Sequence, residues 1–396
     1  MTSLTRRTLI GGCAAGTLLA VAGGTGARAA TRTTASTTAS TTASTTASTT
    51  ASDDAALQAA ISDLSHPPAT SAQLRVDRRG DGWYGTAGTA DIDSGRAVRP
   101  DDRFRAGSVT KAFVATVVLQ LWAERRVELD APIGRYVPDL LPAAFARRIT
   151  VAQLLNHTSG LPDHRGIPDD STPEAVLEHR WDRWTPREWV ETVTHDPLKF
   201  APGTKQEYRG INYVLLALLI EKLTARPYGQ AIASRVLHPL GLTRTLLPGQ
   251  DPRLRGPHVH GYLRMTDGSL RDVTVYNQSS AWGEGELVST VDDLFRFQHA
   301  LFSGALLPPH ALDKLFTLPP DSVRMLDGSP ARYSLGLQTA TVDGVMFWGK
   351  TGETPGYRTR MFATRDLDLR FVLSYTPTPL TTQEEMTNRV VAALIG

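Results

Sequence analysis

Strand-like and helix-like segments occupy different parts of this sequence, and their order is the feature that most constrains the fold. Strand-like segments lie at residues 72–92 and again at 333–376, whereas long apolar segments with helical spacing fill the middle. Two further helix-like segments, at 53–64 and 382–395, flank the strand-like regions. This order predicts an α+β fold, in which an antiparallel sheet built from both ends of the chain is flanked by terminal helices and carries a mostly helical subdomain.

The helical part is predicted from three strongly apolar segments, at residues 108–126, 211–225 and 290–304. Thr290 is expected to cap the third helix, because a threonine before a helix accepts a hydrogen bond from a free backbone N–H group. A shorter helix is expected to end at Gly160, since glycine often terminates helices. A cleft between the sheet and the helical part is the natural place for an active site.

The first 29 residues are interpreted as an export signal. Paired arginines at positions 6 and 7 precede a short apolar segment rich in glycine and alanine, and the segment ends in small residues suited to cleavage. The arginine pair resembles a twin-arginine signal. A transmembrane anchor is the alternative, but the apolar segment is short for a bilayer. We therefore expect a secreted, extracellular protein, with association with the cell envelope left open.

A low-complexity linker is expected at residues 30–54, where Thr, Ala and Ser repeat without large apolar groups. The folded domain is then expected at 55–396. Cys13, the single cysteine, lies within the signal, so the mature chain is expected to contain no disulfide, no zinc–cysteine site and no cysteine nucleophile. Attachment of a lipid to Cys13 is an alternative to signal cleavage. The net charge of +2 and the interspersed charges argue against a nucleic-acid partner.

The stretch "AGSVTKAF" places Ser108 and Lys111 three residues apart at the start of an apolar helix. That spacing puts the two side chains on one face, and a helix N-terminus favours negative charge on a reacting hydroxyl. A buried amine can then accept the serine proton. A helix cap beside a solvated lysine explains the same four residues, so this stretch alone does not decide between the two.

Two further stretches have the same ambiguity. Tyr208 can act as a general base if neighbouring ammonium groups lower its pKa, or it can be an aromatic residue packed at a helix start. In "GKTGETPGY", Lys350 follows a strand-like run, and Gly352 would let a ligand backbone lie against the strand edge. A surface strand ending in a Pro-Gly turn is the alternative.

In their order along the chain, the three stretches resemble the serine β-lactamases and penicillin-binding hydrolases. The text between them resembles the branch that contains class C β-lactamases, Streptomyces-type D-Ala-D-Ala carboxypeptidases and related esterases, from about Thr70 to the C-terminus. The resemblance implies a β-lactamase/transpeptidase-like fold and a serine hydrolase. It favours a D-Ala-D-Ala carboxypeptidase or an enzyme that reacts with β-lactams, acting on small peptides or on peptidoglycan of the cell wall. We expect a monomer.

The resemblance also implies roles for individual residues. Ser108 is expected to be the acylated nucleophile, Lys111 its proton partner, and Tyr208 the base that also protonates the leaving group. The backbone N–H groups of Ser108 and Glu353 would form the oxyanion hole. The other residues expected to line the cavity are Lys350, Thr351, Gly352 and Gly210. No metal or organic cofactor is expected.

Two departures from the family pattern bear on the substrate. The second motif usually reads Tyr-Ser-Asn or Tyr-Ala-Asn, so Gly210 stands where an asparagine would hold the substrate's acyl-side amide. Glu353 stands where a small residue is usual, and it would repel a substrate carboxylate unless it pairs with Arg358 or Arg360. Both departures favour a carboxylesterase or amidase on the same scaffold. A catalytically weak penicillin-binding protein is the third hypothesis.

Several other side chains are of types that often carry function. His157 is expected to form a structural hydrogen bond in a helix-ending turn. His258 and His260 have no acidic partner at a spacing suited to a metal, so a loop is expected there. Trp282 lines the cleft or packs in the core, and the sequence does not separate these two.

Overall fold

The computed structural model describes residues 53–396 of the chain. The predicted export signal at 1–29, Cys13 and all but the last two residues of the predicted linker lie outside the described residues. Residues 53–62 form a helix, so positions 53 and 54 belong to a helix and not to a linker. Their carboxylates pair with Arg78, at 3.1 Å for Asp53 and 3.5 Å for Asp54.

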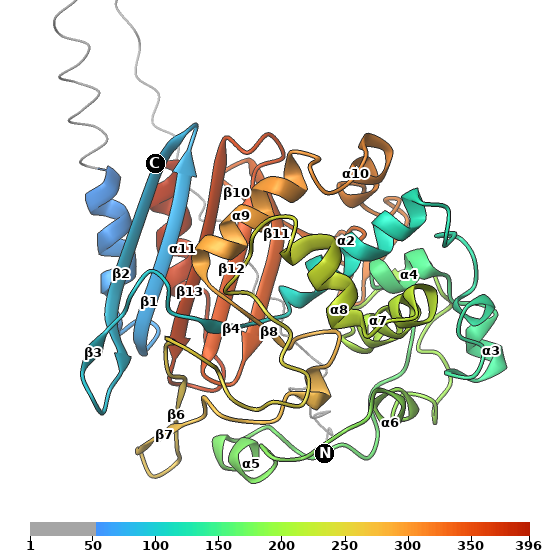
Figure 1. The fold of residues 1–396 in the computed structure, drawn as a ribbon, viewed down its shortest axis with the longest axis horizontal. Coiled ribbons are helices and arrows are strands. Elements are labelled where there is room, and N and C mark those ends of the chain that lie inside the picture. Colours follow the sequence, from blue (N-terminus) through green and yellow to red (C-terminus); the bar gives the residue numbers. More distant parts are fainter. Residues whose placement is uncertain (1–52) are drawn as a thin grey trace, which may run out of the picture.

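The long strands lie towards both ends of the described residues and most of the helices lie between them, as the sequence predicts (Figure 1). The strands are β1 (Ala69–Arg78), β2 (Asp81–Asp91), β3 (Arg96–Ala97), β4 (Phe104–Gly107), β5 (Lys205–Gln206), β6 (Tyr262–Arg264), β7 (Leu270–Asp272), β8 (Leu287–Ser289), β9 (Arg324–Met325), β10 (Gln338–Val342), β11 (Val345–Thr354), β12 (Tyr357–Ala363) and β13 (Leu369–Pro377). The α-helices after residues 53–62 are α2 (Thr110–Ala123), α3 (Ala143–Ala146), α4 (Val151–Leu155), α5 (Pro173–Glu178), α6 (Pro186–Glu191), α7 (Ile211–Thr224), α8 (Tyr228–Ile232), α9 (Val291–Phe302), α10 (Pro309–Leu315) and α11 (Glu385–Ile395). Three other short helical turns are η1 (Ile133–Arg135), η2 (Ala233–Leu237) and η3 (Ser279–Ala281).

The main sheet has seven strands in the order β10-β11-β12-β13-β1-β2-β3, and every neighbouring pair is antiparallel. The N-terminal strand β1 therefore pairs with the C-terminal strand β13, with Leu74 opposite Leu373. This confirms the predicted sheet built from both ends of the chain.

Each face of the sheet is covered by a different set of helices (Figure 1). The helix at 53–62 and α11 cover one face, where Leu57, Val390 and Leu394 pack against Leu74 and Phe371. The other face packs against α9 and the helical subdomain. Thr290 caps α9 as predicted, because its side chain accepts a hydrogen bond from the N–H group of Asp293.

The two most apolar helices, α2 and α7, form the core of the helical subdomain. α2 is buried on almost every side, which explains why its sequence has no polar stripe. Phe113 of α2 stacks on Phe297 of α9, with ring centroids 3.7 Å apart. The helical subdomain and the sheet thus share one hydrophobic core, and α2 begins where they meet.

Two boundaries predicted from the sequence are wrong. The helix expected to reach Gly160 ends at Leu155, because His157 takes a left-handed conformation with φ 60°. The strand expected at 333–340 begins only at Gln338, because a turn intervenes in which Gly336 has φ 125°. Gly160 is needed for a different reason: a Cβ atom there would lie 2.3 Å from the carbonyl oxygen of Phe200.

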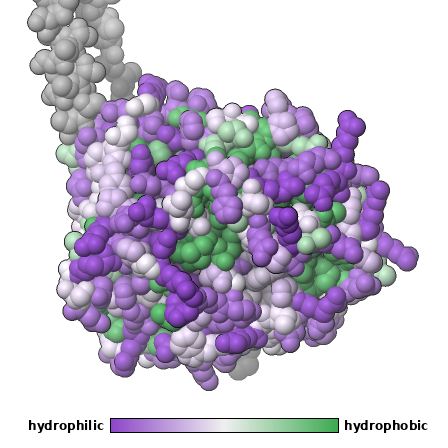
Figure 2. All heavy atoms as spheres, in the orientation of Figure 1, coloured by the Kyte–Doolittle hydropathy of each residue, from purple (hydrophilic) through white to green (hydrophobic). Residues whose placement is uncertain are grey.

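Among residues 53–396, no helix combines the length and apolar character that crossing a membrane requires. Figure 2 shows hydrophilic residues over much of the face in view, with smaller hydrophobic areas between them. The large apolar side chains exposed in this part of the chain come from separate elements: Ile92, Trp181, Val275, Leu326 and Met346.

Candidate active site

Ser108 lies between the end of β4 and the start of α2, on the wall of a cavity of about 200 Å³. The cavity is also lined by Tyr208, Gly210, Glu284 and Glu353. Ser108 precedes α2 by two residues, so its hydroxyl stands at the N-terminal end of that helix. The positive end of the helix dipole stabilises negative charge at this position.

Lys111 reaches Ser108 from the first turn of α2. Its Nζ atom donates to Ser108 Oγ at 3.1 Å, to the carbonyl oxygen of Glu284 at 2.7 Å and to Glu284 Oε2 at 3.3 Å. Lys111 is only 1% exposed, so its hydrogen bonds are made to protein groups away from bulk water. The structure thus places the predicted nucleophile and its predicted proton partner within hydrogen-bonding distance.

Tyr208 stands just before α7, with two lysines beside its ring. Lys111 Nζ lies 5.1 Å and Lys350 Nζ 4.7 Å from the ring centroid. Cations at such distances attract an aromatic ring and stabilise negative charge on a phenol oxygen. The structure therefore gathers the four predicted catalytic side chains, Ser108, Lys111, Tyr208 and Lys350, in one place, and their roles in catalysis stay predictions.

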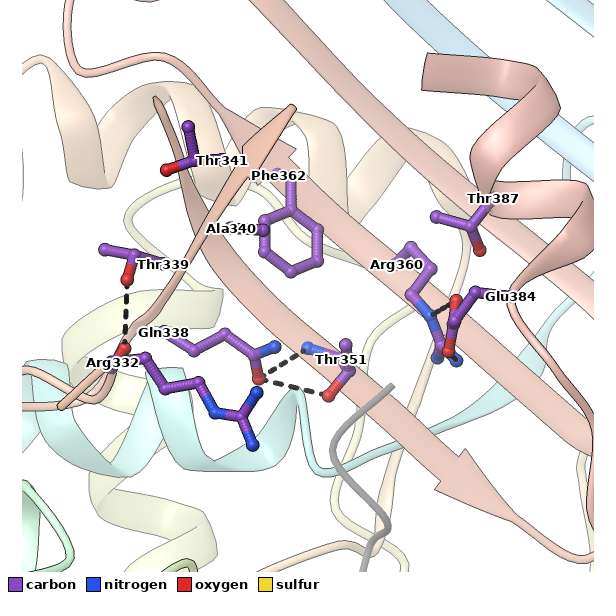
Figure 3. Close-up of a pocket in the computed structure, with 10 residues that line it drawn as sticks. All are labelled: Arg332, Gln338, Thr339, Ala340, Thr341, Thr351, Arg360, Phe362, Glu384 and Thr387. Carbon is purple, nitrogen blue, oxygen red and sulfur yellow. Dashed lines mark hydrogen bonds and ion pairs between the residues drawn. The ribbon is translucent and has the colours of Figure 1, made fainter. Parts of the chain in front are cut away.

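Lys350 projects from β11 and is hydrogen-bonded to Gln338 and Thr351. Its Nζ atom donates to Gln338 Oε1 at 3.1 Å and to the carbonyl oxygen of Thr351 at 2.9 Å. Figure 3 shows the same Gln338 oxygen accepting hydrogen bonds from Thr351, at the edge of a second cavity of about 230 Å³. Gln338 on β10 therefore fixes both Lys350 and Thr351, a role that sequence reasoning did not foresee.

Two glycines let β4 and β11 approach closely beside Ser108. A Cβ atom on Gly352 would lie 1.9 Å from the carbonyl oxygen of Ala106, and a Cβ atom on Gly107 would lie 2.5 Å from the backbone nitrogen of Glu353. Only glycine fits at either position. The approach brings the backbone of Ser108 and that of Glu353 to the same edge of the cavity, as the predicted oxyanion hole requires.

Glu353 is paired with Arg358 and Arg360, the pairing named from the sequence as the way to reduce its repulsion of a substrate carboxylate. Its Oε1 atom accepts from Arg360 Nη2 at 3.0 Å, and its Oε2 atom lies 3.6 Å from Arg358 Nε. Arg360 is also bound to Glu384 of the turn before α11 (Figure 3). The charge of Glu353 is therefore partly neutralised, which weakens its repulsion of a substrate carboxylate.

The space beside Gly210 is occupied by a neighbouring side chain, and the backbone of Gly210 does not itself demand glycine. Its φ and ψ, −61° and −46°, are ordinary helical values that any residue adopts. A Cβ atom at position 210, however, would lie 1.5 Å from Glu284 Oε2. The carboxylate of Glu284 thus fills the space that a side chain at position 210 would need. Sequence reasoning missed Glu284, because nothing in "GEGEL" links it to a glycine 74 positions earlier.

His157 packs against the ring of Tyr208 and accepts a backbone hydrogen bond, in agreement with the structural role expected for it. Its ring centroid lies 4.5 Å from that of Tyr208, and its Nδ1 atom accepts from the backbone N–H group of Arg209 at 3.1 Å. Burial, together with the charges of Lys111 and Lys350, holds the pKa of His157 well below its ordinary value. A neutral, hydrogen-bonded ring is suited to fixing the start of α7.

Acidification is expected to destabilise the fold through His157. Below about pH 6.5 the unfolded chain protonates this histidine while the folded chain does not, so stability falls by up to about 1.4 kcal/mol per pH unit. The free energy of unfolding, measured in urea at pH 7 and pH 5.5, should therefore drop more in the native chain than in His157→Asn. An equal drop in both proteins would contradict this account.

The remaining candidates lie away from the cavity around Ser108. Trp282 packs edge-on against Tyr228, with ring centroids 4.6 Å apart, and does not line that cavity. His258 and His260 stack on each other, and His260 pairs with Asp272 at 2.7 Å. Within the described residues, no three His, Cys, Asp or Glu side chains are grouped as a metal site would require.

Comparisons with known proteins agree on one family. A family model described as Beta-lactamase matches residues 21–394. Penicillin-binding protein 4* of Bacillus subtilis is 26% identical over 79% of this chain and 68% of that protein. Esterase EstB of Burkholderia gladioli is 32% identical over 49% of this chain and 52% of that protein. The chain thus spans about half to two thirds of the length of these curated relatives.

Two solved structures are similar over nearly their whole length. A D-stereospecific amidohydrolase from Streptomyces sp. is 33% identical, with a TM-score of 0.73 over 87% of this chain and 98% of that chain. A D-amino acid amidase from Ochrobactrum anthropi SV3, complexed with D-phenylalanine, is 25% identical, with a TM-score of 0.74 over 87% of this chain and 99% of that chain.

Proposed function

The chain belongs to the Beta-lactamase family, and from this premise we propose that it is a serine hydrolase that cleaves small amides and esters of D-amino acids through an acyl-enzyme at Ser108. The observation that carries the proposal is the meeting of Ser108, Lys111, Tyr208 and Lys350 beside one cavity. The amidohydrolase and the amidase with similar structures support the choice of substrate.

The proposed reaction has two halves. In the first, Ser108 Oγ bonds to the substrate's carbonyl carbon and gives its proton to Lys111, 3.1 Å away. Tyr208 donates a proton to the departing amine or alkoxide as that bond breaks, and Lys350 beside its ring stabilises the negative charge left on its oxygen. In the second half, water attacks the ester carbon and gives a proton to the Tyr208 oxygen. The bond between that carbon and Ser108 Oγ then breaks, and Ser108 takes its proton back from Lys111. The N–H groups of Ser108 and Glu353 would hold the oxyanion in both halves.

A D-Ala-D-Ala carboxypeptidase that also reacts with β-lactams is the second candidate. It is supported by the similarity to a penicillin-binding protein. It is also supported by the pairing of Glu353 with Arg360, since a paired glutamate repels a terminal carboxylate less than a free one. Against it stands Gly210, which leaves no asparagine to hold the acyl-side amide of a peptide.

A substrate panel separates the two candidates. We expect the purified chain to release ammonia from a D-amino acid amide faster than from the L-form, and to cleave the matching aryl ester. It should not release D-alanine from an N-acyl-D-Ala-D-Ala peptide. Mass spectrometry after a rapid acid quench should place the acyl adduct on Ser108. Stable labelling by a fluorescent penicillin with release of D-alanine would favour the second candidate, and an adduct on another residue would overturn both.

A further inference from the structure

We propose that Glu284 binds the α-ammonium group on the acyl part of the substrate, so that the enzyme selects substrates with a free amine over N-acylated ones. The inference rests on the proposed function and narrows its substrate class. It starts from the space beside Gly210. In the family pattern, an asparagine at this position would hold a neutral acyl-side amide, whereas here a carboxylate fills that space.

The carboxylate of Glu284 has capacity for another hydrogen-bond donor. Its Oε2 atom accepts from Lys111 at 3.3 Å and its Oε1 atom from Trp189 Nε1 at 3.4 Å. Both distances exceed the roughly 2.7–2.9 Å that is usual for charged hydrogen bonds. Each carboxylate oxygen can accept about two donors. A substrate ammonium group would supply short, charged hydrogen bonds in their place.

The location suits an acyl-side ligand. Glu284 lines the same cavity as Ser108. Its carbonyl oxygen accepts a hydrogen bond from Lys111, which also donates to the Ser108 hydroxyl. Two other carboxylates line this cavity, those of Asp170 and Glu353, and Glu353 is paired with Arg360 at 3.0 Å. Of the three residues, Glu284 is the one hydrogen-bonded to the lysine beside Ser108, so it is the best placed to balance a positive charge close to the carbonyl carbon that Ser108 attacks.

Selectivity follows from the cost of burying a carboxylate whose cationic partner, Lys111, lies 3.3 Å away. Glu284 is only 8% exposed, so a bound substrate removes much of its remaining water. A free-amine substrate replaces that water with a cation, while an N-acylated substrate offers a single neutral N–H group. Binding of N-acylated substrates is penalised by the same residue that favours amino acid amides and esters.

The test compares one substrate pair in three proteins. A D-amino acid anilide and its N-acetyl derivative are assayed with the native chain, with Glu284→Gln, and with Asp170→Asn, which removes a charge from the same cavity. The native chain should prefer the free amine. Glu284→Gln should raise KM for the free amine about 10- to 100-fold and leave the N-acetyl substrate nearly unchanged. Asp170→Asn should keep the native preference.

The alternative role for Glu284 is to accept a proton from Lys111. In that case Glu284→Gln would lower kcat equally for both substrates, and this result would overturn the proposal. If Glu284→Gln does not fold, the proposal can still be tested by measuring KM against pH with the native chain alone. The α-amino group of the substrate loses its proton near pH 8, so KM for the free amine should rise above that pH while KM for the N-acetyl substrate does not. A parallel change in both KM values would likewise overturn it.

The two proposals fail in different ways. If the proposed function is wrong, neither substrate gives turnover or an adduct on Ser108. If only the role of Glu284 is wrong, both substrates acylate Ser108, and Glu284→Gln changes the kinetic constants for both substrates to the same extent.

Discussion

Ser108→Ala is expected to abolish turnover of every substrate and to remove the acyl adduct. The rate should fall at least about 1000-fold, because the variant lacks the oxygen that forms the covalent bond and the rest of the site cannot replace it. The change removes one buried oxygen, so the fold should be kept. Turnover is measured with an aryl ester, and the adduct is located by mass spectrometry of the intact chain and of its peptides.

The matched control for this prediction is Ser280→Ala. Ser280 lines the same cavity and stands in no predicted motif. It should keep both the activity and the adduct, with a midpoint of thermal unfolding close to that of the native chain. Hydrolysis that survives in Ser108→Ala, or an adduct that moves to another residue, would remove Ser108 from the mechanism.

Tyr208→Phe is expected to lower kcat by about 100- to 10,000-fold while KM changes little. The substitution deletes only the hydroxyl group and keeps the ring that lies between Lys111 and Lys350 and against His157. The loss would therefore measure proton transfer to the leaving group. It should be larger for an amide than for an aryl ester, because an amine must be protonated to leave and an aryl oxide need not be.

Tyr276→Phe is the comparison for Tyr208→Phe. Tyr276 also lines the cavity, and the cation over its ring is Arg105, at 4.4 Å. This variant should retain most of the activity. If Tyr208→Phe lowered kcat less than tenfold for the amide, the proton would have to be carried by Lys111 alone.

The sheet and the main helices could be predicted from the sequence because each follows a local pattern. Strand-like segments separated by turn residues indicate β1 and β2, and apolar segments with helical spacing indicate α2 and α7. Strand-like segments at both ends of the chain predict a shared sheet, but only the structure shows that β1 pairs with β13. The ends of α4 and β10 could not be predicted, since they depend on left-handed or glycine-only backbone angles at His157 and Gly336.

The site was less accessible to sequence reasoning wherever it depends on contacts between distant segments. Ser108 and Lys111 lie three residues apart at the start of α2, so their spacing already predicts contact. Gly210 and Glu284 come from different elements, and only the folded chain shows that one makes room for the other. Gln338 likewise holds Lys350 across two strands, and no motif marks it. Residues that adjust specificity sit at such junctions, where no short pattern identifies them.

The pairing of β1 with β13 also sets an order of events during synthesis. The register joins Leu74 to Leu373, so one edge of β1 has no partner until β13 has left the ribosome. The helical subdomain, by contrast, is complete much earlier. Closing so long a loop is slow, because non-local strand pairs lose chain entropy before they gain contacts. Until β13 arrives, the unpaired edge of β1 presents backbone N–H and C=O groups that could pair with another chain.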